Sequence, residues 1–262
     1  MSPMVRAVLL SIAAALFFTL ETMVVKAITD VPLATIVLAR SIGQLLWTAP
    51  AILRDPIGLM RTRALPMQIL RGLLSITSWY LYFFALSGLP LATATVLSFT
   101  SVLFVTALAG PVLGERVRLR RWSATVVGFA GVLVILRPGA LPLDWSVAAS
   151  IGSALLGAVI LLTTKLLSRA ERTDTIMFYI GIVAVSVSLP VAWSGLAWPG
   201  WPSMGMLVLA GLCGPLAMHL WITSLRLADA SFLAPISYVR LIFAAGFGIA
   251  LFNEGLDWGL GL

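Results

Sequence analysis

Long apolar runs fill most of the chain, and each is separated from the next by a short stretch rich in proline, glycine or charged residues. Because a membrane-spanning helix needs about 20 mostly apolar residues, a run of that length predicts one span. Nine spans are predicted, near residues 5–25, 33–53, 66–87, 91–112, 121–137, 145–167, 175–194, 203–224 and 230–252. Backbone groups in lipid must be satisfied internally and no alternating polar pattern indicates a β-barrel, so the predicted fold class is an all-α integral membrane protein.

Composition agrees with a location in the lipid bilayer. Hydrophobic residues make up 60% of the chain and charged residues 10%, with a mean hydropathy of +1.06, whereas a soluble domain is roughly half apolar and a quarter charged. The first apolar run follows Arg6 and continues to Lys26 without a convincing small-residue cleavage site, so it is expected to stay as a membrane anchor. Cys213 is the single cysteine, which excludes an intramolecular disulfide.

The chain matches itself when it is shifted by 139 residues. The shift places Lys26 on Lys165 and Glu115 on Glu254, and predicted spans one to four on spans six to nine. This indicates an internal repeat of five helices, with residues 1–138 as the first copy and 139–262 as the second. The fifth span predicts a tenth near 260–276, which would be missing from the chain because it stops at Leu262. A truncation and a nine-helix form with its C-terminus outside both explain this, and the repeat favours truncation.

Two copies of five helices must enter the membrane in opposite directions, and the charges of the loops test this. Each arginine-rich loop of one copy has a counterpart in the other copy that is poor in basic residues, with Lys26 as the one basic residue at these counterparts. The basic loops contain Arg54, Arg61 and Arg63 after span two, Arg116, Arg118, Arg120 and Arg121 after span four, and Lys165, Arg169 and Arg172 after span six. The predicted architecture is therefore two inverted repeats with a cytoplasmic N-terminus. This topology accounts for the net charge of +7 without a nucleic-acid partner.

Several stretches resemble a known family in their order and spacing. These are "IVLARSIGQLL" with Arg40, "GLPLATATVLSFTSVLFVTALAGPVLGERV" and its echo "ADASFLAPISYVRLIFAAGFGIALFNEG". The chain is similar over essentially its whole length to the paired EamA domains of the drug/metabolite transporter superfamily. The resemblance implies ten helices around a central cavity, an inner-membrane location, and export or uptake of small organic metabolites as substrates. Whether two copies of the chain form a homodimer is left open.

Glu21 lies in the last turns of the first span, and an ionisable group at membrane depth is a functional candidate. Its neighbours one turn away, Phe17 and Val25, are apolar, so its carboxyl is expected to face the bundle interior. There it would serve as a proton acceptor that couples transport to a proton gradient. The alternative is a structural ion pair with Lys26 or Arg40 near the outer interface.

Arg40 and Arg240 lie inside predicted spans two and nine. A guanidinium group inside the bundle suits a carboxylate or phosphate of a substrate, because it can donate two parallel hydrogen bonds. The substrate is therefore expected to be amino acid-like, either anionic or zwitterionic. The alternative for Arg40 is a structural role in which its side chain extends outward to the membrane interface. Reaching the interface is harder for Arg240, because it lies in the middle of a span.

A lining for the cavity can be proposed from side chains that combine an apolar face with a hydrogen-bonding tip. These are Trp79, Tyr80, Tyr82, His219, Trp221 and Tyr238. Packing, or a position in the interfacial aromatic belt, is the alternative for each of them. Pro215 and Pro235 are expected to interrupt spans eight and nine, and bent helices commonly line such cavities.

The remaining charged candidates are interpreted as structural. Glu115 and Glu254 lie at predicted helix C-termini, where a carboxylate opposes the helix dipole and needs a specific partner, and Lys26 ends the first span. The chain has one histidine and no HExxH, paired-aspartate or Gly-x-Ser-x-Gly motif, so no metal, cofactor or enzymatic activity is predicted. A membrane subunit or scaffold without transport activity stays as the alternative function.

Overall fold

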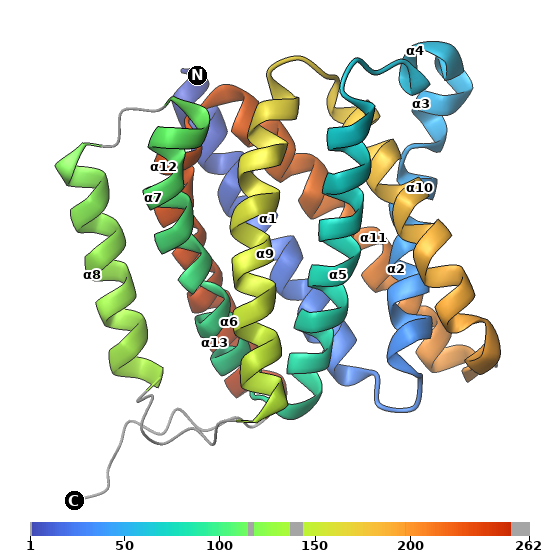
Figure 1. Ribbon diagram of the computed structural model, residues 1–262. Coiled ribbons are helices and arrows are strands. Elements are labelled where there is room, and N and C mark those ends of the chain that lie inside the picture. The colour runs from blue at the N-terminus through green and yellow to red at the C-terminus, as the bar shows by residue number, and fades with distance from the viewer. Residues whose placement is uncertain (1, 115–117, 137–143, 197, 253–262) are drawn as a thin grey trace, which may run out of the picture.

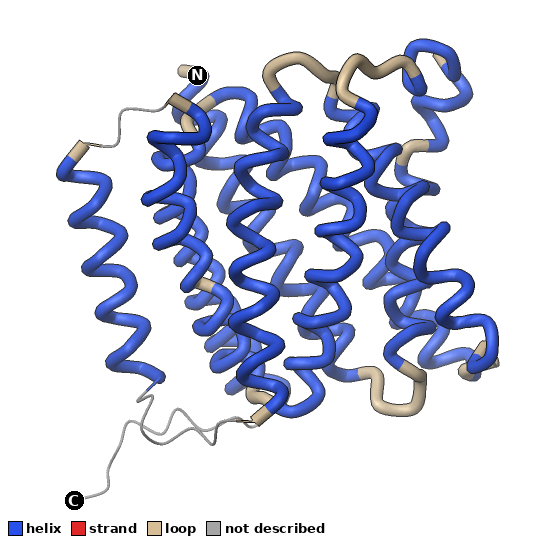
Figure 2. Tube along the Cα trace, in the orientation of Figure 1, coloured by secondary structure: helices blue, strands red, loops and turns tan. Residues whose placement is uncertain are grey.

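The computed structural model describes residues 2–114, 118–136, 144–196 and 198–252, and in these ranges the secondary structure is helical without a strand (Figure 2). Ten α-helices of eight residues or more carry the fold: α1 (Pro3–Ala27), α2 (Leu33–Trp47), α5 (Leu65–Gly88), α6 (Leu91–Ser98), α7 (Thr100–Leu113), α8 (Leu119–Leu136), α9 (Trp145–Ser168), α10 (Thr173–Ala192), α11 (Gly200–Leu227) and α13 (Val239–Phe252). Shorter elements connect them: α3 (Ala49–Arg54), α4 (Pro56–Met60), α12 (Ala230–Leu233) and the 3-10 helices η1 (Trp193–Gly195) and η2 (Ala234–Tyr238).

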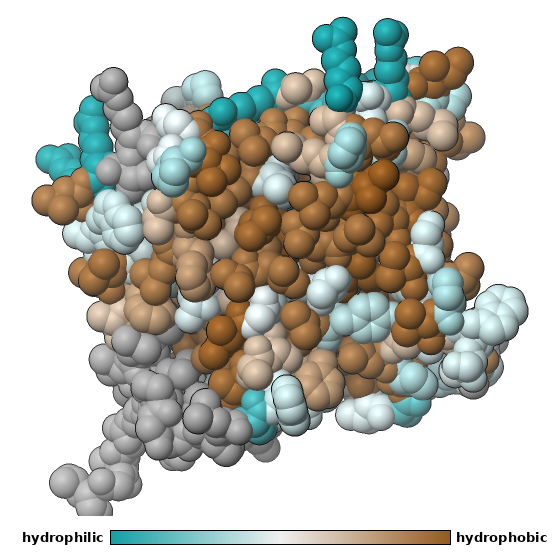
Figure 3. Space-filling view, viewed as in Figure 1, coloured by the Kyte–Doolittle hydropathy of each residue, from teal (hydrophilic) through white to brown (hydrophobic). Residues whose placement is uncertain are grey.

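Eight segments among the described residues are long and apolar enough to cross a membrane, which confirms the all-α membrane fold. They correspond to eight of the nine predicted spans, and α8, with 18 residues, occupies the position of the other, near 121–137. Apolar side chains cover the middle of the bundle and hydrophilic ones gather at its upper edge in Figure 3. The surface pattern is that of a protein whose middle faces lipid.

Three of the predicted spans are interrupted. The apolar pattern did not indicate two of these interruptions. The span at 33–53 breaks after Trp47, where the Thr48 hydroxyl donates to the Leu45 carbonyl at 2.7 Å. The span at 91–112 breaks at Phe99. The span at 230–252 tightens into η2, which contains Pro235 as predicted, whereas α11 continues through Pro215 without a break in its assignment.

The packing of the helices has the pattern that two inverted copies would produce. α1 packs along α11, while α9 and α5, their respective counterparts at the 139-residue shift, pack along each other. α1 and α9 run in opposite directions in Figure 1. The lysines at their C-terminal ends make matching bonds: Lys26 Nζ donates to the Leu89 carbonyl at 3.0 Å, and Lys165 Nζ to the Ala228 carbonyl at 2.7 Å. The structural role predicted for Lys26 therefore has a physical basis, because it joins the end of α1 to the loop after α5.

The two ends of the bundle differ in their exposed side chains. At the N-terminal side, the end at which α1 begins (Figure 1), the exposed arginines gather: Arg54, Arg61, Arg63, Arg118, Arg120, Arg169 and Arg172. At the opposite end the exposed side chains include Trp145, Trp198 and Trp201. Glu115 and Glu254, for which a structural role is predicted, lie outside the described residues.

Candidate functional site

A cavity of about 250 Å³ lies in the centre of the bundle, among α1, α2, α5, α7, α9, α11 and the beginning of α13. Six of the predicted site residues line it: Glu21, Arg40, Trp79, Tyr82, Trp221 and Arg240. The serines at positions 11, 78, 98, 101, 153 and 237 add hydroxyl groups to its wall. The cavity therefore combines charged, aromatic and hydroxyl groups at the depth of the membrane, as a small-molecule site requires.

Glu21 and Arg40 form an ion pair in this cavity. Glu21 Oε1 lies 2.6 Å from Arg40 Nε, and the side chains are 3% and 1% exposed. At this distance the attraction of the opposite charges holds the pair together. The Arg40 guanidinium also stacks on Trp79, with Cζ 3.4 Å from the ring centroid. The pair with Arg40 is thus present, and both of its residues line the central cavity.

The carboxylate of Glu21 reaches this position because α11 carries a glycine opposite it. A Cβ atom added at Gly214 would collide with Oε1 of Glu21. α1 and α11 pack along each other over much of their length, so a larger residue at position 214 would displace either the carboxylate or the helix. Gly214 is a residue of the site that the sequence analysis did not identify, because a glycine in an apolar helix carries no chemical signal.

Arg240 lies at the second residue of α13, directly after η2, and its side chain is half-buried. Its Nη2 donates to the Tyr82 hydroxyl at 3.3 Å, and its Cζ lies 5.4 Å from the Tyr82 ring centroid and 5.8 Å from that of Phe18. Its Nε has no hydrogen-bond partner among the described residues. Arg240 thus presents a guanidinium group to the cavity with a donor to spare.

A third arginine, Arg71 on α5, is fully buried and was missed in the sequence analysis. Its Nε donates to the Thr164 hydroxyl at 2.5 Å, its Nη1 to the Ser75 hydroxyl, and its Nη2 to Met218 Sδ at 3.6 Å. The sequence did mark Arg71 as a candidate, because it lies six residues inside a 24-residue apolar helix. A charged residue of a connecting loop would not lie that far inside the helix. Three interior arginines therefore stand against a single carboxylate, that of Glu21, in the part of the bundle around the cavity.

The other predicted lining residues lie away from this cavity. The Tyr80 hydroxyl and His219 Nδ1 have no hydrogen-bond partner among the described residues, and the His219 ring lies 6.2 Å from that of Trp47. Tyr238 packs against Phe99 with ring centroids 5.0 Å apart and donates to the Thr125 carbonyl at 3.4 Å. None of these three side chains lines the central cavity. A search of the described residues for groups of three or more metal-ligating side chains finds none.

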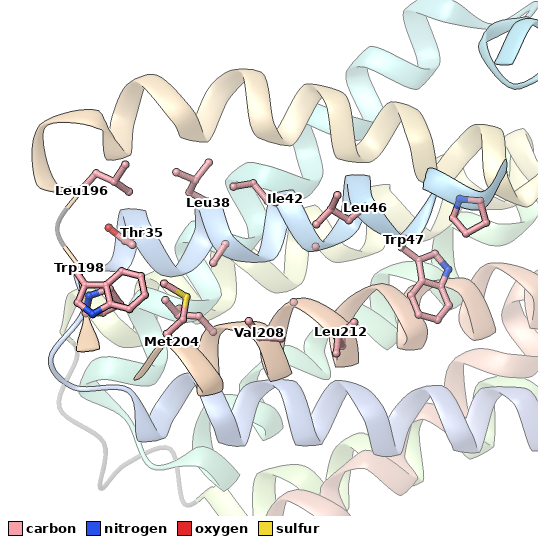
Figure 4. Close-up of a pocket in the computed structure, with 16 residues that line it drawn as sticks. Thr35, Leu38, Ile42, Leu46, Trp47, Leu196, Trp198, Met204, Val208 and Leu212 are labelled. Carbon is pink, nitrogen blue, oxygen red and sulfur yellow. The ribbon is translucent and has the colours of Figure 1, made fainter. Parts of the chain in front are cut away.

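A larger groove of about 830 Å³ runs between α2 and α11, and it differs from the central cavity in chemistry (Figure 4). Ile42 and Leu46 of α2 and Val208 and Leu212 of α11 line it, and all four side chains are exposed. No charged side chain borders it. The groove thus belongs to the apolar surface, and the candidate site is the smaller, charged cavity.

A helical bundle of membrane-spanning length with a charged cavity at its centre is an arrangement typical of multi-pass membrane transporters. Comparison with known proteins agrees with this class. Residues 5–137 match the model of the EamA-like transporter family, so the chain belongs to that family.

The curated relatives are transporters of different small molecules. The S-adenosylmethionine uptake transporter of Rickettsia bellii is 32% identical over 73% of this chain, and the match spans 66% of that protein's length. The pseudopaline exporter CntI of Pseudomonas aeruginosa is 30% identical over 95% of this chain and 89% of its own. The riboflavin transporter of Rhizobium johnstonii is 29% identical over 75% of this chain and 65% of its own. A protein of known crystal structure, 20% identical, has the same fold, with a TM-score of 0.74 over 92% of this chain and 89% of its own.

Proposed function

We propose that this protein moves a small organic metabolite that carries a carboxylate or another anionic group across the membrane by alternating access. The observation that carries the proposal is the charge of the cavity wall, where Arg40 and Arg240 outnumber Glu21. Arg40 already has a carboxylate at 2.6 Å, whereas Arg240 forms no ion pair of this kind among the described residues: its hydrogen bond goes to the neutral Tyr82 hydroxyl, and the charge of Glu21 acts on it only from a greater distance. A charged side chain away from water needs a counter-charge, and a substrate anion would supply it.

Glu21 has a role in this proposal as the group that exchanges partners. With Glu21 ionised, its ion pair occupies Arg40. Protonation of Glu21 would remove the negative charge and leave the Arg40 guanidinium free to bind the substrate anion, so one proton would accompany each substrate. Proton coupling of this kind predicts that exchange by Glu21→Gln is independent of pH, because the glutamine side chain has no proton to gain or lose.

The exposed arginines at the N-terminal side support a cytoplasmic location for that side, in an inner membrane. A reporter fused before Met1 tests this orientation. Activity of a reporter that functions only in the cytoplasm agrees with the proposal, and activity of one that functions only outside contradicts it.

Proteoliposomes with the purified protein test transport itself. A panel of labelled zwitterions and carboxylic acids, including S-adenosylmethionine, is offered with and without an imposed pH gradient. Arg240→Gln removes a hydrogen bond from a charged group, which is worth about 1.5–3 kcal/mol, so uptake at low substrate concentration should fall roughly 10- to 150-fold. Arg61→Gln is the matched control, because it removes the same charge from an exposed position of the N-terminal side.

Each result has a clear meaning. Uptake of an anionic or zwitterionic compound that Arg240→Gln reduces and Arg61→Gln leaves unchanged supports the proposal. Equal loss in both variants would mean that surface charge, not the cavity, controls uptake. No uptake across the panel would favour the alternative of a membrane subunit or scaffold.

A further inference from the structure

Two fully buried polar side chains lie on α5 between the central cavity and the N-terminal side of the bundle. Gln68 and Arg71 are three residues apart, so they share one face of the helix, and both are 0% exposed. Neither lines the central cavity. α5 begins at Leu65, so both lie within its first two turns.

Arg71 is held there by neutral groups alone. The hydroxyls of Thr164 and Ser75 accept its hydrogen bonds, and each of these hydroxyls donates its own proton to a backbone carbonyl, that of Ile160 or of Arg71. Its third partner is the thioether of Met218, a weak acceptor. No carboxylate among the described residues pairs with it, so the charge is buried without a counter-charge.

Unsatisfied amide groups lie on α5 and on α2, which packs against α5. Both Gln68 Nε2 and Gln68 Oε1 are buried without a hydrogen-bond partner among the described residues. Across on α2, Gln44 donates to Met177 but its Oε1 is likewise without a partner. Buried polar groups are almost always hydrogen-bonded, so a set of this kind indicates a partner that is not part of the protein.

Met218 connects this region with the central cavity. Its side chain lines the cavity and its sulfur accepts from Arg71 Nη2, so it stands between the cavity and the guanidinium group. Methionine is unbranched and adapts its shape readily. An anion that leaves the cavity toward the N-terminal side would replace this weak acceptor with a strong one.

We propose that Gln68 and Arg71 form a second binding site, for the anionic group of the substrate, on the N-terminal side of the central cavity. The guanidinium of Arg71 binds the anion, and the Gln68 amide donates a further hydrogen bond to it. The inference rests on the proposed transport of anionic metabolites. It adds that the substrate passes two arginine sites in succession, Arg240 in the cavity and then Arg71.

The test measures thermal unfolding of the purified protein in detergent as succinate or inorganic phosphate is added at constant ionic strength. Succinate probes recognition of a carboxylate and phosphate that of a phosphoryl group. In Arg240→Gln, measured at a pH at which Glu21 stays ionised and occupies Arg40, at least one of these anions should still raise the melting temperature by roughly 3 to 5 °C at ten times its dissociation constant. In Arg240→Gln/Arg71→Gln the shift should disappear.

Two further variants keep the test decisive if Arg71→Gln does not fold. Gln68→Leu in the Arg240→Gln background retains the buried charge and should weaken the anion-dependent shift, whereas Met218→Leu removes only the competing acceptor and should preserve or enlarge it. A shift that survives both Arg71→Gln and Gln68→Leu overturns the second site. The second site is also overturned if the single substitution Arg240→Gln abolishes the shift, and this result leaves the proposed function intact. Absence of both a shift and uptake in the unmodified protein would instead reject the proposed function.

Discussion

The ion pair between Glu21 and Arg40 should show a large coupling energy in a double-mutant cycle. The two atoms lie 2.6 Å apart and the side chains are 3% and 1% exposed, so water screens neither charge. Removal of one partner of a buried pair costs about 3–5 kcal/mol, because the other charge stays buried alone. Glu21→Gln leaves the interior arginines without any carboxylate, and Arg40→Gln also loses the contact with Trp79, which is worth about 2 kcal/mol when desolvated.

The double variant Glu21→Gln/Arg40→Gln contains neither charge, so it should be more stable than the sum of the two single effects predicts. We expect a coupling energy of about 2–4 kcal/mol. The assay is reversible unfolding in mixed detergent micelles, with the free energy of unfolding measured for all four proteins. The pair of Asp55 and Arg172 is the matched control: its atoms are 2.9 Å apart, but both side chains are at least half exposed, so its coupling should be far smaller. Equal coupling in the two pairs would refute the claim that burial makes the Glu21–Arg40 pair strong.

Three further predictions use backbone contacts and one exposed carboxylate. Gly43→Ala should destabilise the protein by about 1–3 kcal/mol, because the added Cβ would collide with the backbone of Gly211. Gly211→Ala is the control and should be tolerated, because its Cβ meets its neighbours at ordinary distances. Equal melting temperatures of the two variants would contradict this prediction. Gly214→Ala should displace the carboxylate of the ion pair and reduce uptake in proteoliposomes more than Gly211→Ala does. The Gly58 amide, with help from Arg172, holds the pKa of the Asp55 carboxyl below its ordinary value. The order of α4 is therefore present above the ordinary pKa of an aspartate and is lost as the pH falls through the lowered pKa. In Arg172→Gln, faster amide hydrogen exchange at Gly58 should begin at a higher pH.

The positions of the spans could be predicted because bilayer thickness sets the length of an apolar run, whatever the helices then contact. The interruption at Phe99 could not, since neither Phe99 nor the residues on either side of it are proline or glycine, and hydroxyl bonds to the preceding turn are a common feature of unbroken helices as well. The other two interruptions lie beside a proline, Pro50 in the first turn of α3 and Pro235 in η2, and a missing N–H is visible in the sequence. Apolar length thus predicts where a helix crosses, and packing decides where it breaks.

The candidate site was partly predictable for a related reason. A charge in an apolar run identifies Glu21, Arg40 and Arg240 whatever the rotation of the helix, because the bilayer excludes it. Aromatic side chains carry no such signal, and their direction depends on how each helix is rotated. Trp79 and Tyr82, three residues apart, share the face toward the cavity, whereas Tyr80, next to Trp79, does not line it.

Each charged residue of the site has an uncharged counterpart in the other copy of the repeat. Shifted by 139 residues, Glu21 corresponds to Ile160 and Arg240 to Ser101, and all four side chains line the same cavity. The charges therefore come from α1, α2 and α13, while α7 and α9 contribute their neutral counterparts. A backbone with a nearly twofold arrangement thus encloses an asymmetric set of side chains, and a substrate with one anionic end would have one preferred orientation in it. This asymmetry predicts that Ser101→Arg, which adds a guanidinium group at the repeat counterpart of Arg240, weakens discrimination between monoanionic and dianionic substrates in the proteoliposome panel. Unchanged discrimination would mean that the substrate does not contact position 101.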